Sequence, residues 1–288
     1  MNREADKSTI WTAWFQGRER APRHVQRIFR LWEDLNPDRR LHVIEDAEAE
    51  SILDRVGVRQ HKVTPQIKSD IIRLVCLKEH GGVWVDSTVL PMAPLSDWVD
   101  ELTSPAGFFA FHSSGDPNLV LPSWFLSSSE ANNPLVSHWC DLFVDYFRTP
   151  RCWANWKRAV YNVKIRDYIR FSMALRRRDT TWFVDPAQGR DCFFYPYMTI
   201  CYTFAYLLKA DHEVREIWER VPVRWHTLPA LAGRAAADPE TPAATLQKEI
   251  CEILPHAPVH KLNHKDRRFD AVVTSARELL GLPPDENP

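Results

Sequence analysis

The stretch from Thr64 to Pro91 (TPQIKSDIIRLVCLKEHGGVWVDSTVLP) constrains the fold of this 288-residue chain more than any other. It predicts a helix, because its opening Thr-Pro pair supplies a cap and a residue suited to the first helical position. Apolar side chains then recur at helical spacing, at Ile67, Ile71, Leu74, Val75 and Leu77. Gly81 and Gly82 tolerate positive φ and end the helix, and the short apolar run after them is typical of a strand buried on both faces. Asp86 therefore follows a buried strand, at the edge where open α/β sheets bind their ligands.

Asp70 and Arg73 lie three residues apart on the predicted helix, so one helix face can present both side chains. A carboxylate accepts hydrogen bonds from sugar hydroxyls, whereas a guanidinium donates to hydroxyls or phosphates. The alternative is an ion pair on a solvated helix face, worth only a few tenths of a kcal/mol. Together with Asp86, a hard oxygen ligand of the kind that Mg²⁺ prefers, the pair predicts a ligand-binding site.

The segments SDIIRL and KEHGGVWVDST resemble the core of the sugar transferases with a DxD motif, glycosyltransferase family 32 and its relatives. Within that group they are most similar to the capsular polysaccharide synthesis proteins. IWTAWFQG, the Ala21-Pro22 helix start and PVHKLNHK are similar as well. The resemblance implies an α/β chain of GT-A (Rossmann-like) architecture, with a mostly parallel sheet flanked by helices and helical additions in the C-terminal half. It also implies transfer of a hexose from a nucleotide diphosphate sugar, with a UDP-sugar favoured, and retention of the anomeric configuration.

The resemblance also implies roles for individual residues. Asp70, Arg73 and Asp86 would form the catalytic set. The donor would be held by six residues, of which Asp70 and Arg73 also belong to the catalytic set. They are Trp14, Gln16, Ser69, Asp70, Arg73 and Lys265. A Mn²⁺ or Mg²⁺ ion would neutralise the departing diphosphate, held by Asp86, Thr88, Asn263, His260 and His264. Trp14 would stack on the nucleobase, the alternative being that it packs in the core.

Thr88 departs from the DxD pattern, because many relatives carry a second Asp at this position. Either the metal depends on Asp86, the diphosphate, water and the C-terminal loop, or metal dependence is reduced. In that loop Lys265 or Lys261 is the side chain expected to contact phosphate. A different reading is a zinc site on one helix face, formed by His256, His260 and His264. Two prolines among them, at 255 and 258, argue against a helix there.

The formal net charge of −1 gives no global field that would recruit nucleic acid, and no recognition motif supports that partner. Arg148–Arg178 is the exception, with ten basic residues and one acid, a net charge of +9. Tryptophans and tyrosines are interleaved with these charges. We expect the span either to contact an anionic membrane surface or lipid-linked acceptor, or to be a solvated helix face.

The six cysteines form no CxxC pair, and most lie among apolar neighbours, which favours a reducing compartment. The first residues, MNREADKSTI, contain no apolar leader, and no apolar run reaches the length of a membrane span. We therefore expect a cytoplasmic protein, or one peripheral at the inner face of the cell membrane.

From the sequence we expect one GT-A domain, 9–280, between a disordered N-terminus (1–8) and a tail (281–288). At the end of its first strand, 10–15, Gln16 begins a turn. After the second, Glu45 or Asp46 could approach the nucleobase or ribose, although Asp46 is better suited to cap the next helix. The expected regions are a nucleotide-sugar-binding core (9–104), an acceptor-side and helical region (105–228), a mobile linker or lid (229–245) and a closing segment (246–280).

On the acceptor side, the loops after two later strands carry His112, Asp116 and Glu130, each of which suits a turn or structural role as well. The acceptor itself would be a polysaccharide, a lipid-linked glycan or another glycan. Two alternatives stay open at this point. One is a non-catalytic nucleotide-sugar or glycan binding protein that keeps the fold, which Thr88 favours and the intact Asp70, Arg73 and Asp86 oppose. The other is a transferase that glycosylates a protein.

Overall fold

The computed structural model describes residues 9–58, 63–113, 115–148, 169, 172–173, 176, 181, 184–185, 198–263 and 268–283. The predicted disordered N-terminus, most of the tail and nearly all of the basic span lie outside these residues. Among the described residues, no helix is both long enough and apolar enough to cross a membrane.

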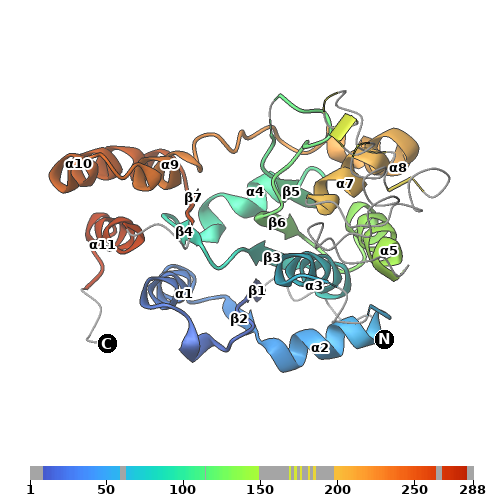
Figure 1. Cartoon of the computed structure of the whole chain (residues 1–288), viewed down its shortest axis with the longest axis horizontal. Coiled ribbons are helices and arrows are strands. Elements are labelled where there is room, and N and C mark those ends of the chain that lie inside the picture. Colours follow the sequence, from blue (N-terminus) through green and yellow to red (C-terminus); the bar gives the residue numbers. More distant parts are fainter. Residues whose placement is uncertain are drawn as a thin grey trace.

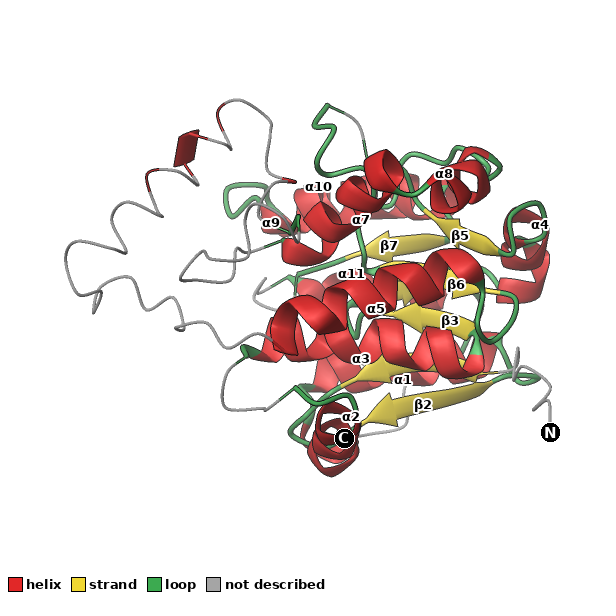
Figure 2. Cartoon of the chain, turned by 90° about the vertical axis from the view of Figure 1, so that its right-hand side faces the viewer, coloured by secondary structure: helices red, strands yellow, loops and turns green. Residues whose placement is uncertain are grey.

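A five-stranded sheet forms the centre of the fold, in the order β2-β1-β3-β6-β5 (Figure 1). Its strands are β1 (Thr9–Ala13), β2 (Arg40–Ile44), β3 (Gly82–Val85), β5 (Phe108–Ala110) and β6 (Phe125–Ser128). β1 pairs in parallel with β2 and β3, whereas β6 pairs antiparallel with β3 and β5. Four strands therefore run in one direction and β6 is reversed; Figure 2 shows β2, β3, β6 and β5 one above the other. The predicted α/β class with a mostly parallel sheet is confirmed.

Helices cover both faces of this sheet. α1 (Arg23–Leu35) and α11 (Phe269–Leu279) pack together on one side, and α3 (Pro65–His80) and α5 (Pro134–Arg148) pack together on the other (Figure 1). α2 (Asp46–Arg55) packs against α3. The predicted helical character of the C-terminal half is confirmed by α7 (Thr199–Ala210), α8 (His212–Glu219), α9 (Leu231–Ala237), α10 (Ala243–Ile253) and α11. Shorter elements are α4 (Val99–Thr103) and the 3₁₀ turns η1 (Arg18–Arg20), η3 (Leu95–Asp97) and η6 (Leu254–His256).

The central motif folds as its residues predict. The Thr64 hydroxyl accepts from the Ile67 amide at 3.1 Å, Pro65 is the first helical residue, and Gly81 ends α3 with φ 70°. All four residues of β3 are buried. An alanine at position 81 would need an unfavourable left-handed conformation and would place its Cβ 3.0 Å from the Glu130 carbonyl carbon. The helix therefore passes directly into the strand that carries Asp86.

Two boundaries differ from the prediction. The first strand ends at Ala13, so Trp14 and Phe15 lie in the turn that follows it. Asp46 is not the cap of α2: Glu45 is the N-cap residue, with no side-chain capping bond, and the Asp46 carboxylate pairs with Lys68 at 2.6 Å. Lys68 is almost fully buried, and a buried ammonium without a negative partner costs more free energy than an uncapped helix end that is exposed to water.

A second, two-stranded sheet brings the C-terminal part of the chain to the central motif. β4 (Val89–Pro91) pairs antiparallel with β7 (Val259–Lys261), and Val89 lies opposite Lys261. The Leu262 amide donates to the Thr88 carbonyl at 3.0 Å, which extends the pairing to the end of the motif. This pairing places His260 in a strand, so the zinc site on a helix face is wrong.

The segment 229–245, predicted to be a linker or lid, contains α9 and the start of α10. α9 lies against β7 with Ala232 and Ala236 buried. Its Gly233 allows a close approach, because a Cβ there would lie 2.4 Å from the Lys261 carbonyl oxygen. The segment is therefore not an unstructured linker, and it supports the strand that carries Lys261.

We predict that Gly233→Ala destabilises the protein by about 1–3 kcal/mol, because an extra methyl group cannot fit between α9 and β7. Helix propensity alone predicts the opposite sign, a gain of about 1 kcal/mol for Gly to Ala. Urea unfolding of both proteins measures the difference. An alanine variant more stable than the wild type would contradict the close packing of α9 on β7.

Candidate functional site

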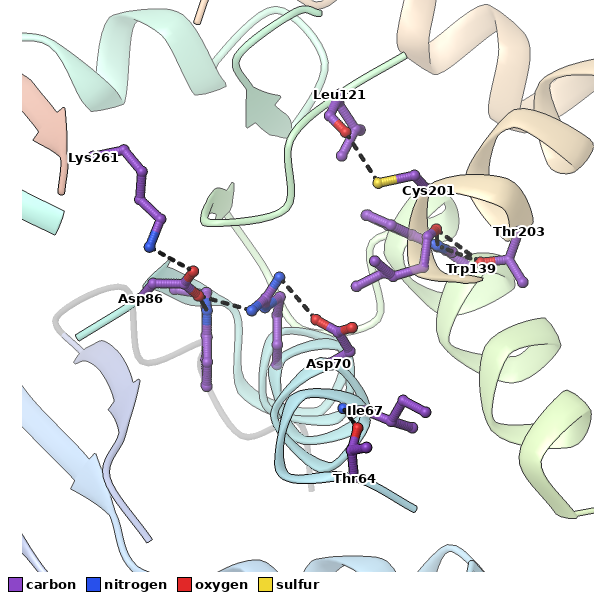
Figure 3. A network of polar contacts seen from close by, with 12 residues as sticks. Thr64, Ile67, Asp70, Asp86, Leu121, Trp139, Cys201, Thr203 and Lys261 are labelled. Atoms are coloured by element: carbon purple, nitrogen blue, oxygen red, sulfur yellow. Dashed lines mark hydrogen bonds and ion pairs between the residues drawn. The ribbon is translucent and has the colours of Figure 1, made fainter. Parts of the chain in front are cut away.

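Asp86 is the first residue after β3, and its carboxylate is the centre of a polar cluster (Figure 3). Its backbone amide donates to the Trp124 carbonyl at 2.9 Å, which fixes the residue at the sheet edge. Oδ1 accepts from the Arg73 guanidinium at 2.8 Å and from the Trp84 indole at 3.2 Å. Oδ2 lies 3.2 Å from the Lys261 ammonium. One carboxylate thus joins a helix, a strand end and the C-terminal strand β7.

Arg73 lies between two carboxylates. Its guanidinium contacts Asp86 on one side and Asp70 Oδ1 on the other, at 3.1 Å, and stacks 5.1 Å from the centre of the Trp84 ring. The side chain is only 4% exposed. The alternative of an ion pair on a solvated helix face is therefore wrong. The structure brings Asp70, Arg73 and Asp86 together, and their catalytic roles remain predictions.

Lys261 completes the cluster from the far end of the sequence. Its ammonium contacts Asp86 Oδ2 and donates to the Thr88 hydroxyl, so it touches both the first and the third residue of the Asp-Ser-Thr motif. Thr88 is buried, whereas the Lys261 side chain is 30% exposed. Lys265 and His264, which the sequence favoured for phosphate and metal, lie outside the described residues.

His260 does not reach this cluster. Successive side chains of a strand point to opposite faces, so His260 and its neighbour Lys261 face opposite ways on β7. The imidazole is fully buried and its Nε2 donates to the Leu254 carbonyl at 3.0 Å. Burial lowers the pKa of His260, which keeps it neutral at physiological pH. Its assignment as a metal ligand is therefore wrong, whereas the role of Asn263, exposed just after β7, stays a prediction.

A hollow of about 730 Å³ opens beside the carboxyl ends of β1 and β2. Phe15, Gln16, Glu45 and Asp46 are among the residues that line it. Trp14 is half-buried against the core, so the lining aromatic is its neighbour Phe15, whose ring lies 4.6 Å from the Lys68 ammonium. The stacking role of Trp14 and the donor contact of Gln16 stay predictions, as does that of Ser69, which is partly exposed beside Asp70 on α3.

The described residues do not fit a divalent cation. Mg²⁺ and Mn²⁺ need several free oxygen ligands, but both Asp86 oxygens already accept from cationic or N–H partners. The Thr88 hydroxyl is engaged by Lys261. Nor do the residues that the structure describes include any group of three or more His, Cys, Asp or Glu side chains that could hold a metal ion.

The two carboxyls of the cluster differ in protonation. Burial raises the pKa of Asp70 to about 7, opposed by Arg73 and reinforced by the charge of Asp86. Burial acts in the same direction on Asp86, but Lys261 and Arg73 outweigh it and hold the pKa of that carboxyl below its usual value. Asp86 is therefore ionised at physiological pH, while Asp70 is poised to gain or lose a proton.

The thiol of Cys201 on α7, whose pKa burial raises to about 12, is not a nucleophile here (Figure 3).

Two of the residues predicted on the acceptor side, Asp116 and His112, have different surroundings in the structure. Asp116 accepts from the Asn118 amide at 2.9 Å and is a turn residue. The His112 ring lies 4.5 Å from the Trp218 ring, and burial lowers its pKa. The nearby segment 223–228 contains Trp225, 50% exposed and bridged to His112 through the backbone. Sequence reasoning missed Trp225, because an exposed tryptophan and a buried one look alike in a sequence.

Residues 1–156 match a known protein family, described as "Capsular polysaccharide synthesis protein". This match covers more than half of the 288 residues. The chain belongs to this family. The central motif, β1 and β3 all fall within the matched part, whereas β7 and Lys261 lie beyond it.

More distant relatives of this capsular polysaccharide synthesis family member are sugar transferases by name. The initiation-specific alpha-1,6-mannosyltransferase of Candida albicans is 24% identical over 100 residues, which are 31% of this chain and 26% of that protein. The chain thus matches about a quarter of that relative's length. Among solved structures, PaToxG glycosyltransferase shares 15% identity and aligns with 96% of this chain and 88% of its own, with a TM-score of 0.36. A likeness that weak carries no argument here.

We predict that Asp70→Asn gains stability relative to the wild type as the pH rises from about 5 to about 8. An unfolded aspartate loses its proton near pH 3.8, but the folded carboxyl keeps its proton to about pH 7. The folded wild type binds more protons in this window, so its stability falls as the pH rises, whereas asparagine has no proton to lose. The relative gain is a few kcal/mol at most, since one pKa unit corresponds to about 1.4 kcal/mol.

Urea unfolding at both pH values measures this difference, with Asp54→Asn on the exposed surface of α2 as the control. A stability difference between Asp70→Asn and the wild type that stays constant with pH would show that burial does not hold the proton on Asp70.

Proposed function

We propose that this chain is a glycosyltransferase that moves a hexose from a nucleoside diphosphate sugar, with UDP favoured, to a glycan or lipid-linked acceptor. The observation that carries the proposal is the buried Arg73, held between Asp70 and Asp86 beside Lys261 at the carboxyl end of β3. Two cations converge there on a position where α/β sheets bind ligands. Family membership and the name of the yeast relative support the same activity.

The proposed reaction needs a site that accepts from sugar hydroxyls and stabilises a growing negative charge. The bond between the anomeric carbon and the diphosphate oxygen breaks, and its electron pair stays with the diphosphate. The acceptor hydroxyl oxygen bonds to the anomeric carbon, and its proton passes to the departing diphosphate. Asp70 would accept from a hydroxyl of the transferred sugar, and the Arg73 and Lys261 cations would stabilise the diphosphate. Retention of configuration follows from the family resemblance alone.

The hollow beside β1 and β2 suits the nucleoside part of the donor. It lies at the same sheet edge as Asp86 and offers an aromatic ring, Phe15, and two carboxylates, Glu45 and Asp46, as partners for a base and a ribose. The Glu45 carboxylate already accepts from the Arg18 amide at 2.8 Å, which holds it against the turn after β1. The exposed Trp225, which pairs with His112 through the backbone, supports a glycan acceptor, because a flat aromatic face suits a sugar ring.

A binding protein without turnover is the second candidate, and two observations favour it. Thr88 stands where a second acidic residue would be expected, and the Asp86 oxygens are already paired with protein cations. Such a protein would bind a nucleotide sugar and leave the glycosidic bond intact. The two candidates therefore differ in turnover and agree in donor affinity.

We expect one nucleoside diphosphate sugar to raise the thermal unfolding temperature and to be slowly hydrolysed in the absence of an acceptor. A screen of donors by thermal shift and sugar release, each with and without Mn²⁺, measures both, and candidate glycans are added once a donor is found. Asp86→Ala should lose hydrolysis by about 100-fold or more, because Arg73 and Lys261 lose their shared partner.

Asp54→Ala, on the exposed surface of α2, is the control and should match the wild type. Binding of a donor with no release of sugar would favour the binding protein. No effect of any donor, with or without metal, would reject both candidates.

A further inference from the structure

The Lys261 ammonium occupies the place between the two motif side chains. It lies 3.2 Å from Asp86 Oδ2 and donates to the hydroxyl of Thr88, the residues at the first and third positions of Asp-Ser-Thr. These are the two positions from which the motif would hold a cation. A protein cation thus makes the contacts that the resemblance reserves for a metal ion.

The backbone holds this lysine firmly. Lys261 pairs with Val89 across the two strands, and its amide donates to the Pro229 carbonyl at 2.9 Å. Behind it, α9 packs so closely that Gly233 has no room for a side chain. Because β7 cannot slide without breaking these contacts, the fold fixes the backbone of Lys261, and the contacts with Asp86 and Thr88 then orient its ammonium.

The charges at the cluster can accommodate an anion. Asp86 is shared by two cations, Arg73 and Lys261, and Arg73 also pairs with Asp70. These four side chains are neutral in sum when Asp70 is ionised and carry a net charge of +1 when Asp70 is protonated, so the cluster has no excess negative charge to repel a phosphate. Thr88 is neutral, so it orients the ammonium without cancelling its charge. A second aspartate at position 88 would cancel it. In a metal site, a neutral threonine at position 88 would be a weaker ligand than aspartate. In a site where the cation is a lysine, the threonine is the better partner.

Lys261 is also accessible to a ligand. Its side chain is 30% exposed, whereas Arg73 is 4% exposed. The ammonium has three donors, of which Asp86 and Thr88 account for two. Within the part of the chain that the structure describes, no contact uses the third, which can donate to a phosphate oxygen.

We propose that Lys261, oriented by Asp86 and Thr88, binds the diphosphate of the donor in place of a divalent cation, so that donor binding and transfer need no metal ion. This inference rests on the proposed function. When the bond to the sugar breaks, the negative charge that grows on the diphosphate is met by the Lys261 ammonium, with Arg73 stabilising the opposite side of Asp86. No redox change or further reactant is involved.

The experiment measures UDP and GDP binding by calorimetry, in EDTA and in Mn²⁺, and uses the wild-type chain. We expect the dissociation constant for the preferred nucleotide to change by less than about twofold between EDTA and Mn²⁺. In the same samples, electron paramagnetic resonance of Mn²⁺ should show no ion bound to the chain, with or without nucleotide. A nucleotide that binds in Mn²⁺ and not in EDTA would overturn this inference and leave the proposed function standing. Binding of neither nucleotide under either condition, together with no thermal shift and no sugar release from any donor of the screen, would overturn both.

Variants test the role of the lysine itself. Lys261→Ala should weaken nucleotide binding by about tenfold or more, the effect of one charge-assisted hydrogen bond to a phosphate. Lys248→Ala, at an exposed position of α10, should bind like the wild type. The double variant Lys261→Ala/Thr88→Asp presents two carboxylates and no ammonium, so we expect it to bind Mn²⁺ and to need it for nucleotide binding. Wild-type affinity of Lys261→Ala in EDTA, with the fold verified by circular dichroism, would contradict the proposal.

Discussion

The buried guanidinium of Arg73 is the constraint on which the rest of this structure depends. Removing a charge from water costs several kcal/mol unless it is compensated, and here Asp70, Asp86 and the Trp84 ring provide the compensation. Asp70 comes from the same helix, whereas Asp86 follows the next strand. Arg73 can be paired on both sides only if α3 ends and β3 begins as they do, through the positive φ of Gly81. The ion pairs therefore hold the central helix and strand in one arrangement.

The sharing of Asp86 explains why the C-terminal part of the chain is needed at the site. Asp86 is shared between two cations, and the second of them, Lys261, arrives through the β4–β7 pairing. α9 supports β7 from behind, and α11 is tied to α1 by the ion pair of Arg27 with Asp270, at 2.9 Å. β7, α9 and α11 lie outside the family match, which ends at residue 156, yet β7 supplies the most accessible cation of the cluster.

Local signals predicted the part of the site that depends on neighbouring residues, and failed where contacts span the chain. Thr64, Pro65 and the paired glycines act over one helix and one strand, so their positions, and the meeting of Asp70, Arg73 and Asp86, were predictable. The sequence correctly predicted that the segment PVHKLNHK reaches the site. It did not predict which residue of the segment, Lys261, faces Asp86. That choice depends on strand register, because a shift of one residue exchanges Lys261 for His260. The hollow shows the same limit, since Phe15 lines it and Trp14 does not. The segment 229–245 was predicted to be a linker because its residues are small and include prolines. Its residues 231–237 form α9 because Ala232 and Ala236 are buried against β7.

The claim that a protein cation takes the place of a metal ion at the motif is tested most directly by a crystal structure of the chain with UDP and Mn²⁺, with data collected at the manganese absorption edge. We expect diphosphate oxygens within hydrogen-bonding distance of the Lys261 ammonium and no anomalous peak between Asp86 and Thr88. A manganese peak between those two side chains, with Lys261 displaced from them, would contradict it.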